Sequence, residues 1–420
     1  MSFIGSPPLR QLLQSPIAYV ALYVALYGAF GVASPFWPKL FETKGLTSQQ
    51  IALVLAVALV MRLAAGPLIG RLADHMGSLR FVLASSAVVA AAAAAAFLVS
   101  HSFWAVLLVA LIQAAALAPT TSLADALAVN AARPRRAGKP FEYGWLRGAA
   151  SAAFLSGTLM IGQLISSSDL TPVIWMNAGL LLVAAAAAAS IPGATPDRRR
   201  PGERSAGAPE LRGLLKLSPF RAVVAVSALV YGSHALYDAF AVIRWSDAGL
   251  GTSVISVLWA EAVAAEVIVF FLVGPALLKR LGVRGAAVLA VGAGIVRWSL
   301  MGLASSVLLL AFLQPLHGLT FALLHLACMR VLANVVPSGI AATAQAVYAF
   351  GSGLVTAALT WASGTLYVAY GGRAFLWMAA LCAIALPFAW LGFAAASDRS
   401  AERALSGSAS AGQNRADPAA

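Results

Sequence analysis

Long apolar runs separated by short polar stretches make up most of the chain. A helix that crosses a bilayer needs about 20 mostly apolar residues. Twelve such runs can be counted, at 16–40, 48–70, 80–100, 103–130, 142–166, 171–191, 218–243, 253–276, 284–303, 306–332, 340–366 and 373–396. The pattern predicts an all-α integral membrane protein with twelve transmembrane helices. The first run is too long for a cleaved signal peptide and is expected to remain as the first helix.

Composition agrees with this prediction and excludes other classes of protein. Of 420 residues, 61% are hydrophobic and 10% are charged, whereas a soluble domain is about half apolar and a quarter charged. An ordinary soluble enzyme and a disordered protein are therefore excluded. The two cysteines, Cys328 and Cys382, lie inside apolar runs, which argues against a disulfide framework or a zinc site.

The charge is strongly basic, with 28 Lys and Arg against 15 Asp and Glu. The basic residues lie between apolar runs, where they mark the cytoplasmic side of a membrane protein rather than a nucleic-acid surface. If both termini are cytoplasmic, the outside keeps little beyond Lys39, Lys44, Arg244 and Arg373. We therefore predict cytoplasmic N- and C-termini, a multi-pass membrane protein, the lipid bilayer as a partner, and no nucleic-acid partner.

Composition also divides the chain into parts. Residues 1–191 and 218–397 each hold six apolar runs and are predicted to form two six-helix bundles. Residues 192–217 contain four prolines and six basic residues and are predicted to be a cytoplasmic linker that cannot fold alone. Residues 398–420 are polar and rich in Ser, Ala and Gly, which predicts a disordered cytoplasmic tail.

The two halves share short patterns at nearly the same offset. A Gly-Leu pair followed by Ile occurs at 45–51 and again 204 residues later at 249–255. A polar turn that ends in glycine occurs at 74–77 and again 205 residues later at 279–282. Each match alone is weak, but together they indicate an internal duplication.

The loop after the second run carries a motif, G-x3-D-x2-G-x2-R, made by Gly70, Asp74, Gly77 and Arg80. It resembles the helix 2–3 loop signature of the major facilitator superfamily. Gly70 would allow close helix contact, Gly77 would form a tight turn, and Asp74 would pair with basic groups or a helix N-terminus. A plain polar loop is the alternative, but the position among the runs favours a gating motif.

Further motifs between residues 16 and 395 together resemble the phenylpropionic acid transporter group, relatives of lactose permease and nucleoside:proton symporters. The motifs are Pro35-Phe36-Trp37-Pro38, Tyr143-Gly144-x2-Arg147-Gly148, Ser233-His234-Ala235-x-Tyr237, Leu258-Trp259-x6-Glu266, Arg297-Trp298, and His317-Gly318-Leu319-Thr320-Phe321-x3-His325. In the fifth run the group's usual Trp-Gly-Ser is replaced by Trp145 and by Ala149-Ala150-Ser151.

The resemblance implies two six-helix bundles around a central cavity that open to each side in turn. It also implies a monomeric secondary transporter that takes up a small-molecule solute with protons. Together with the compact loops, the resemblance implies the plasma membrane of a bacterium, the inner membrane, as its location. An aromatic acid is the first expectation for this solute, and a sugar or nucleoside is the second.

Charged residues inside the runs are candidates for proton coupling, because a charge at the bilayer centre costs about 3 kcal/mol and needs a partner. Glu266 and Arg297 lie at depths that differ by about 5 Å, which predicts an ion pair. A carboxylate beside an arginine has a lowered pKa and releases its proton, and it binds a proton again once the arginine moves away. A permanent structural ion pair is the alternative. Lactose permease also has a carboxylate on helix 8 and an arginine on helix 9. By the same resemblance, its helix 10 histidine corresponds to His317 or His325.

A second candidate pair lies in the seventh run. His234 and Asp238 are four residues apart and share a helix face. Histidine titrates near neutral pH, so this pair would carry a proton or bind solute. A local hydrogen bond without a role in transport is equally open.

Asp125 and Arg147 lie a similar short way from the cytoplasmic face and are the main solute-binding candidates. Arg147 suits a carboxylate because a guanidinium binds it with two parallel hydrogen bonds; the alternative is that Arg147 extends toward the cytoplasm. The remaining candidates are polar or aromatic residues within the runs, namely Glu261, Tyr237, Trp259 and Arg62.

No motif of an enzyme or an ATP-driven pump is present: G-x-S-x-G, Walker A and HExxH are all missing from the sequence. We therefore expect a protein that is not an enzyme, with no cofactor and no metal. Proton-driven export is an alternative to uptake. A membrane sensor or scaffold that does not transport is a further alternative, but it has no need for costly charges inside the membrane.

Overall fold

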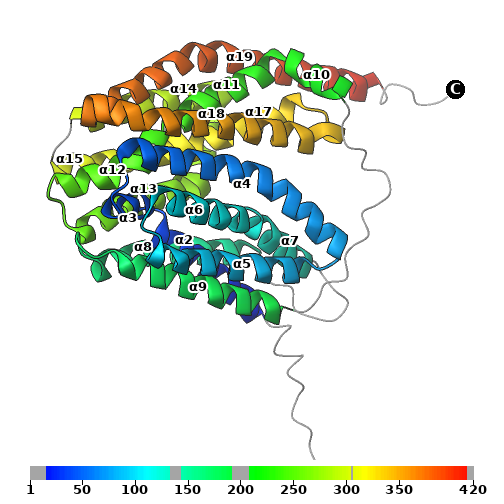
Figure 1. The fold of residues 1–420 in the computed structure, drawn as a ribbon. Helices are drawn as coiled ribbons and strands as arrows, with labels where there is room; N and C mark the ends of the chain where they lie inside the picture. The colour runs from blue at the N-terminus through cyan, green and yellow to red at the C-terminus, as the bar shows by residue number, and fades with distance from the viewer. Residues whose placement is uncertain (1–15, 133–142, 192–207, 304–305, 414–420) are drawn as a thin grey trace, which may run out of the picture. The chain divides into compact units, whose positions relative to one another are not determined.

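The computed structural model describes residues 16–132, 143–191, 208–303 and 306–413. Within these ranges the regular structure is entirely helical (Figure 1). The predicted all-α class is therefore confirmed.

The first half of the chain contains eight α-helices and one short 3₁₀ turn among the described residues. They are α2 (Pro16–Ala33), α3 (Trp37–Thr43), α4 (Ser48–Met76), α5 (Leu79–Ala96), η1 (Phe97–Val99), α6 (Phe103–Leu117), α7 (Thr120–Ala132), α8 (Tyr143–Leu164) and α9 (Thr171–Ser190).

The second half is more interrupted. Its elements are α10 (Ala208–Lys216), α11 (Ser218–Gly232), α12 (Ala235–Asp247), α13 (Thr252–Ile268), η2 (Val269–Val273), α14 (Gly274–Leu303), α15 (Val307–Leu313), α16 (Leu316–Gly318), η3 (Leu319–Leu323), α17 (Leu324–Val335), η4 (Ser338–Ile340), α18 (Ala341–Tyr370), η5 (Gly371–Ala374) and α19 (Phe375–Gln413). The η2 and η3 segments are π-helical turns.

Eight helices among the described residues are long and apolar enough to cross a membrane, or nine if α2 and α3, bent by 46°, form one span. Two of them, Thr252–Leu303 and Ala341–Ala394, are 52 and 54 residues long, more than twice the length of about 20 residues that one crossing needs. The first is broken at Gly282, which has a φ of 67°. Twelve crossings and cytoplasmic termini remain predictions.

The chain forms two compact units. Unit 1 contains Met1–Pro201, Asp238–Ala260 and Thr360–Val368, and unit 2 contains Gly202–Tyr237, Glu261–Leu359 and Ala369–Ala420.

The packing of unit 1 centres on α2, which contacts α8 and α9. A Cβ added at Gly31 of α2 would collide with the carbonyl oxygen of Phe154 in α8, so only glycine permits this approach of the two backbones. Thr158 also donates a 2.8 Å hydrogen bond to the carbonyl oxygen of Gly31. This close contact brings the tyrosines of α2 to the residues of α8 that are described below.

Unit 1 also includes segments from the second half of the chain. The hydroxyl of Thr252 at the start of α13 donates to the carbonyl oxygen of Ile165 at 3.0 Å, and Ser253 bonds the side chain of Gln163 at 2.9 Å. Phe240 of α12 stacks on Tyr367 of α18 with 4.5 Å between ring centroids. Unit 1 is therefore assembled from residues far apart in the sequence.

Unit 2 packs α14 against α17 and α19, and α11 against the same two helices. Trp298 of α14 is fully buried and stacks on Phe375 of α19 at 5.8 Å. Its indole N–H donates to the hydroxyl of Ser233 at 2.8 Å. This buried tryptophan holds the neighbouring Arg297 in the interior of unit 2.

The repeated turns all contain a glycine with positive φ. Gly45 and Gly249 both have a φ of 84°, and Gly77 and Gly282 have φ values of 62° and 67°. A positive φ favours glycine. Gly77 is left-handed helical with a ψ of 19°, whereas Gly282 has a ψ of 178°, so these two share only the positive φ. The structure thus supports the internal duplication that the sequence suggests.

The predicted linker and the predicted tail both contain helical residues. The predicted linker at 192–217 lies partly outside the described residues, and its last part forms α10. Where the sequence suggests a disordered tail at 398–420, the backbone continues in α19 to Gln413.

Candidate functional site

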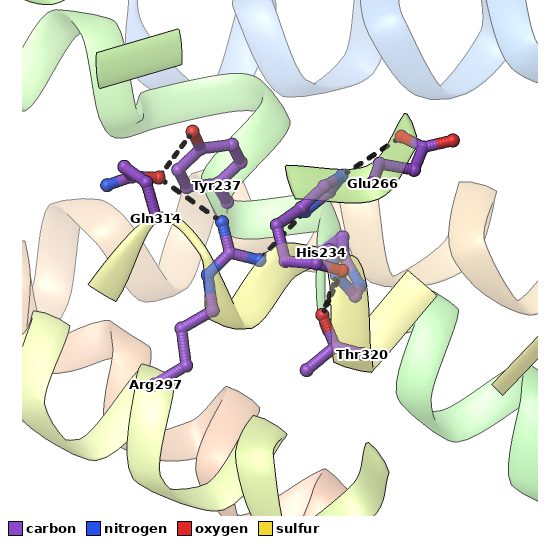
Figure 2. A network of polar contacts seen from close by, with 7 residues as sticks. His234, Tyr237, Glu266, Arg297, Gln314 and Thr320 are labelled. Carbon is purple, nitrogen blue, oxygen red and sulfur yellow. Dashed lines mark hydrogen bonds and ion pairs between the residues drawn. The ribbon is translucent and has the colours of Figure 1, made fainter. Parts of the chain in front are cut away.

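Unit 2 contains a polar network around Arg297 of α14, which is fully buried with 0% exposure (Figure 2). A buried guanidinium is costly unless its N–H groups find acceptors. Its Nη1 lies 2.9 Å from Nδ1 of His317, and its Nη2 lies 3.4 Å from Oε1 of Gln314. The guanidinium also lies over the rings of Tyr237 and Trp298, at 4.7 and 4.4 Å from their centroids.

The contact with Arg297 indicates which ring nitrogen of His317 carries the proton. A guanidinium has donors only, so Nδ1 of His317 must accept and the ring proton must sit on Nε2. This Nε2 lies 3.6 Å from Oε2 of Glu266. A neutral imidazole therefore connects the arginine to the carboxylate.

The predicted partners Glu266 and Arg297 are thus brought into one network, with His317 contacting both. The sequence pointed to an ion pair of these two residues and placed His317 only as a further candidate. The imidazole position was not predictable, because it depends on how the tenth apolar run bends.

Local backbone features place His317 beside Glu266. A Cβ at Gly318 would lie 2.5 Å from the carbonyl oxygen of Ala265, so glycine lets this turn approach α13 directly next to Glu266. The π-helical turn η3 begins one residue after Gly318, and η2 begins three residues after Glu266. Single π-helical turns are frequent at functional sites because they redirect side chains.

His234 is a second buried histidine in this network and lies between α11 and α12. Its Nδ1 is 2.9 Å from the carbonyl oxygen of Val230, and its Nε2 is 3.0 Å from the hydroxyl of Thr320. A carbonyl only accepts, so Nδ1 carries a proton. Its ring centroid is 5.2 Å from that of His317.

The sequence predicts that His234 and Asp238 share one helix face, but the helix is interrupted at His234. α11 ends at Gly232 and α12 begins at Ala235, so the two residues do not share one continuous helix. Both ring nitrogens of His234 contact other groups, and Asp238 belongs to unit 1. His325 lies on α17, where its ring is 5.9 Å from that of Phe270.

Unit 1 contains a second polar cluster, around Asp125 of α7. Tyr23 of α2 donates to its Oδ1 at 2.5 Å, and Tyr143 of α8 donates to the same oxygen at 2.8 Å. The two phenols therefore satisfy this carboxylate oxygen with strong, charge-assisted hydrogen bonds.

Arg147 of α8 belongs to the same cluster, as its pairing with Asp125 in the sequence suggests. Its Nη1 lies 3.8 Å from Oδ1 of Asp125 but donates to the hydroxyl of Tyr27 at 2.6 Å. The side chains of Arg147 and Asp125 are 39% and 37% exposed. The guanidinium is thus accessible, and its short hydrogen bond goes to a neutral phenol rather than to the carboxylate.

Sequence reasoning missed the tyrosines of α2. Tyr23 and Tyr27 stack on each other at 5.9 Å, as residues four positions apart on one helix face do. Their i, i+4 spacing was the available signal, but an aromatic pair in an apolar helix is also a common packing feature. Gln314, Tyr143 and Thr320 were likewise not predicted as members of either cluster.

Of the four remaining solute-binding candidates, Arg62, Glu261 and Trp259 do not join these clusters in the contacts described above. Arg62 is exposed on α4, and Glu261 is half-buried on the part of α13 that belongs to unit 2. Trp259 is buried on α13 within unit 1. Tyr237 does join, because its hydroxyl donates to Oε1 of Gln314 at 3.0 Å.

The gating motif forms a helix end. Gly77 terminates α4 in a left-handed conformation, and its N–H donates to the carbonyl oxygen of Asp74 at 3.2 Å. Arg80 donates to the carbonyl oxygen of Ile191 at 3.1 Å and so ties the start of α5 to the end of α9. Nothing lies within 4 Å of a Cβ built at Gly70, so the close helix contact expected there is absent.

Among the residues that the structure describes, no group of three or more His, Cys, Asp or Glu side chains is arranged to hold a metal ion. The titratable residues of the two clusters instead bond to each other, to phenols and to amides. This arrangement suits proton transfer and the binding of a polar solute.

Comparison with known proteins places the chain among transporters. Residues 17–379 match the family model described as "MFS_1 like family". The "Probable 3-phenylpropionic acid transporter" of Escherichia coli (strain K12) is 31% identical over 386 residues, which cover 90% of this chain and 97% of the relative.

Solved structures show the same fold at low sequence identity. A crystal structure of the nucleoside transporter NupG superposes with a TM-score of 0.72 at 17% identity, covering 91% of this chain and 98% of NupG. A bacterial homologue of the human lysosomal transporter Spinster, inward-facing and unoccupied, has a TM-score of 0.71 at 16% identity, with 94% and 99% covered.

Proposed function

Because the chain belongs to the MFS_1 like family of membrane transporters, we propose that it takes up a small aromatic carboxylic acid together with protons. It is a multi-pass membrane transporter and not an enzyme. In the proposal it works as a monomer in a bacterial inner membrane, by alternating access, with the Asp74 loop as a cytoplasmic gate. The name of the 31% identical relative supports 3-phenylpropionic acid as the first substrate to test.

The observation that carries proton coupling is the position of His317 between Arg297 and Glu266. In the neutral state Nδ1 accepts from Arg297. A proton that binds His317 places N–H groups on both ring nitrogens, and Nδ1 then opposes a guanidinium that also only donates. Protonation therefore breaks the contact with Arg297 and strengthens the contact with Glu266.

Glu266 gives this network a route for protons. Its side chain is 30% exposed, whereas that of His317 is 13% exposed. In the proposal a proton attaches to Nδ1 of His317 as Arg297 moves away, because Nε2 already carries the ring proton. The proton on Nε2 then passes to the carboxylate of Glu266, which leaves a neutral ring with its proton on Nδ1. The same steps in reverse return the proton, so loading and unloading change the contacts of one buried arginine.

The cluster in unit 1 supports a carboxylate as the solute. Two tyrosine hydroxyls donate to Asp125, whereas Arg147 makes its short hydrogen bond to the hydroxyl of Tyr27. A solute carboxylate is a stronger acceptor for the guanidinium than a phenol is. In the proposal it displaces Tyr27 from Arg147, and Asp125 stays bound to Tyr23 and Tyr143.

The test is uptake in liposomes that contain a pH-sensitive dye. Addition of 3-phenylpropionate outside should acidify the lumen in the wild type. Glu266→Gln should abolish this acidification but retain exchange of labelled for unlabelled solute across the membrane. The matched control is Glu261→Gln, a second carboxylate of α13 that lies outside the described network.

The result separates the possible functions. Uptake of the acid without proton movement contradicts the role of Glu266 and His317. Transport of a sugar or a nucleoside from the same panel, with no transport of the acid, contradicts the role of Arg147 as a carboxylate site. No flux of any solute in either direction contradicts transport as proposed.

A further inference from the structure

A groove of about 480 Å³ lies on unit 2 between α11 and α19, and none of its lining residues belongs to the network around Arg297. Its lining residues are Ser218, Arg221, Ala222 and Ala225 of α11 and Pro387, Phe388, Leu391 and Gly392 of α19. Most of these side chains are apolar, and Phe388 and Leu391 are 47% and 70% exposed. The surface is suited to hydrocarbon along most of its length.

The groove follows from the way the two helices meet. A Cβ at Gly392 would collide with the Cβ of Ala222, so α11 and α19 are in close contact at this point. One turn away, Pro387 lies inside α19 and has no N–H to donate to the preceding turn. The small residues of α11 and the larger Phe388 and Leu391 then form the floor and the wall of a furrow.

Arg221 places a positive charge in this otherwise apolar groove, and its side chain is exposed. Among the described residues, no acidic side chain forms an ion pair with it. Further positive charge comes from α10, which contacts α11 and precedes it directly (Figure 1). Arg212 and Lys216 of α10 are exposed, while Leu214 is buried.

An amphipathic helix with basic residues on its polar face is typical of a membrane interface. α10 has this character, and the basic residues near it are those that predict the cytoplasmic side. The cytoplasmic leaflet carries anionic lipids, which attract clusters of basic residues next to the membrane. The charged end of the groove therefore lies where an anionic headgroup would be available.

We propose that this groove binds an anionic phospholipid. Arg221 contacts the phosphate, Arg212 and Lys216 supply further positive charge, and one acyl chain lies along Phe388 and Leu391. A soluble anion would leave the apolar wall uncovered, and an uncharged hydrocarbon would leave Arg221 without a counter-charge. An amphiphile with a net negative headgroup satisfies both parts of the surface.

Native mass spectrometry of the delipidated full-length protein tests this site. Titration with phosphatidylglycerol and phosphatidylcholine should show tighter binding of the anionic lipid. Arg221→Gln should weaken binding of phosphatidylglycerol about fivefold, the effect expected for one basic residue near an anionic membrane lipid, and should leave phosphatidylcholine unchanged. The matched control is Arg373→Gln, which changes an exposed arginine of unit 2 in η5.

A variant that fills the groove distinguishes the contribution of the acyl chain to binding from that of the headgroup. Ala225→Trp should reduce the binding of both lipids while Arg221 remains in place. Glycerol phosphate, which has no acyl chain, should not displace bound phosphatidylglycerol. The proposal is overturned if Arg221→Gln binds phosphatidylglycerol as the wild type does, if Arg373→Gln loses as much binding, or if glycerol phosphate displaces the lipid.

Discussion

The two units each hold an arginine within a polar cluster, and the two arginines differ in their burial and in the groups that they contact. Arg297 in unit 2 is fully buried and contacts an imidazole nitrogen and an amide oxygen. Arg147 in unit 1 is 39% exposed, and its short hydrogen bond goes to a phenol.

The carboxylates also differ in their surroundings. Glu266 reaches Arg297 through a titratable ring, whereas two phenols that stay neutral near pH 7 hold Asp125. The first arrangement changes when a proton arrives, and the second does not. Similar residue types therefore suit a proton relay in unit 2 and a solute site in unit 1.

The largest effect is expected for Arg297→Ala. It leaves Nδ1 of His317 without its donor and opens a cavity, although Gln314 still accepts from Tyr237. We expect the free energy of unfolding to fall by about 3 kcal/mol and uptake to be abolished. Thermal unfolding in detergent and liposome uptake measure the two effects. Arg373→Ala is the control; if the two variants unfold alike, the buried network does not stabilise unit 2.

His317→Gln should distinguish a role of His317 in proton coupling from a role of its hydrogen bonds in the structure. A glutamine side chain can accept from Arg297 and donate to Glu266 but does not titrate. We expect proton-driven accumulation to fall at least about tenfold, since general proton transfer by a positioned side chain contributes about a hundredfold or more, while solute exchange continues. His317→Ala should impair both activities. Undiminished accumulation in His317→Gln would rule out the imidazole as a proton carrier.

Arg147→Gln should weaken binding of 3-phenylpropionate about tenfold to a hundredfold, because hydrogen bonds to charged groups contribute about 1.5–3 kcal/mol. The corresponding amide, which has no negative charge, should bind the variant and the wild type equally. Isothermal titration in detergent measures both ligands. An equal loss for acid and amide would indicate a general disturbance of the site.

The smallest effect, and the one with the opposite sign, is expected for Tyr27→Phe. Removal of the hydroxyl takes away the competitor for Arg147 and should tighten binding of the acid about fivefold, which corresponds to one hydrogen bond of about 1 kcal/mol. Tyr23→Phe should instead weaken binding, because it frees Asp125 to pair with Arg147. The same titration measures both variants, and weaker binding in Tyr27→Phe would show that its hydroxyl contacts the solute directly.

The sequence alone was sufficient for the all-helical class and the transporter family. Apolar runs of bilayer length leave the backbone no alternative to helix inside a membrane, and the motif around Gly77 predicted a turn that the structure shows. It also singled out Glu266 and Arg297 in one half and Asp125 and Arg147 in the other, because charged residues inside apolar runs are rare and need partners.

The tertiary structure decided which atoms meet. Gly318 and the neighbouring π-helical turns bring His317 next to Glu266, and the close contact at Gly31 brings Tyr23 and Tyr27 to α8. These approaches depend on the distance between two backbones and on the rotation of one helix relative to another. Hydrophobic periodicity does not encode either quantity, because every face of these helices is apolar and many rotations bury the same side chains.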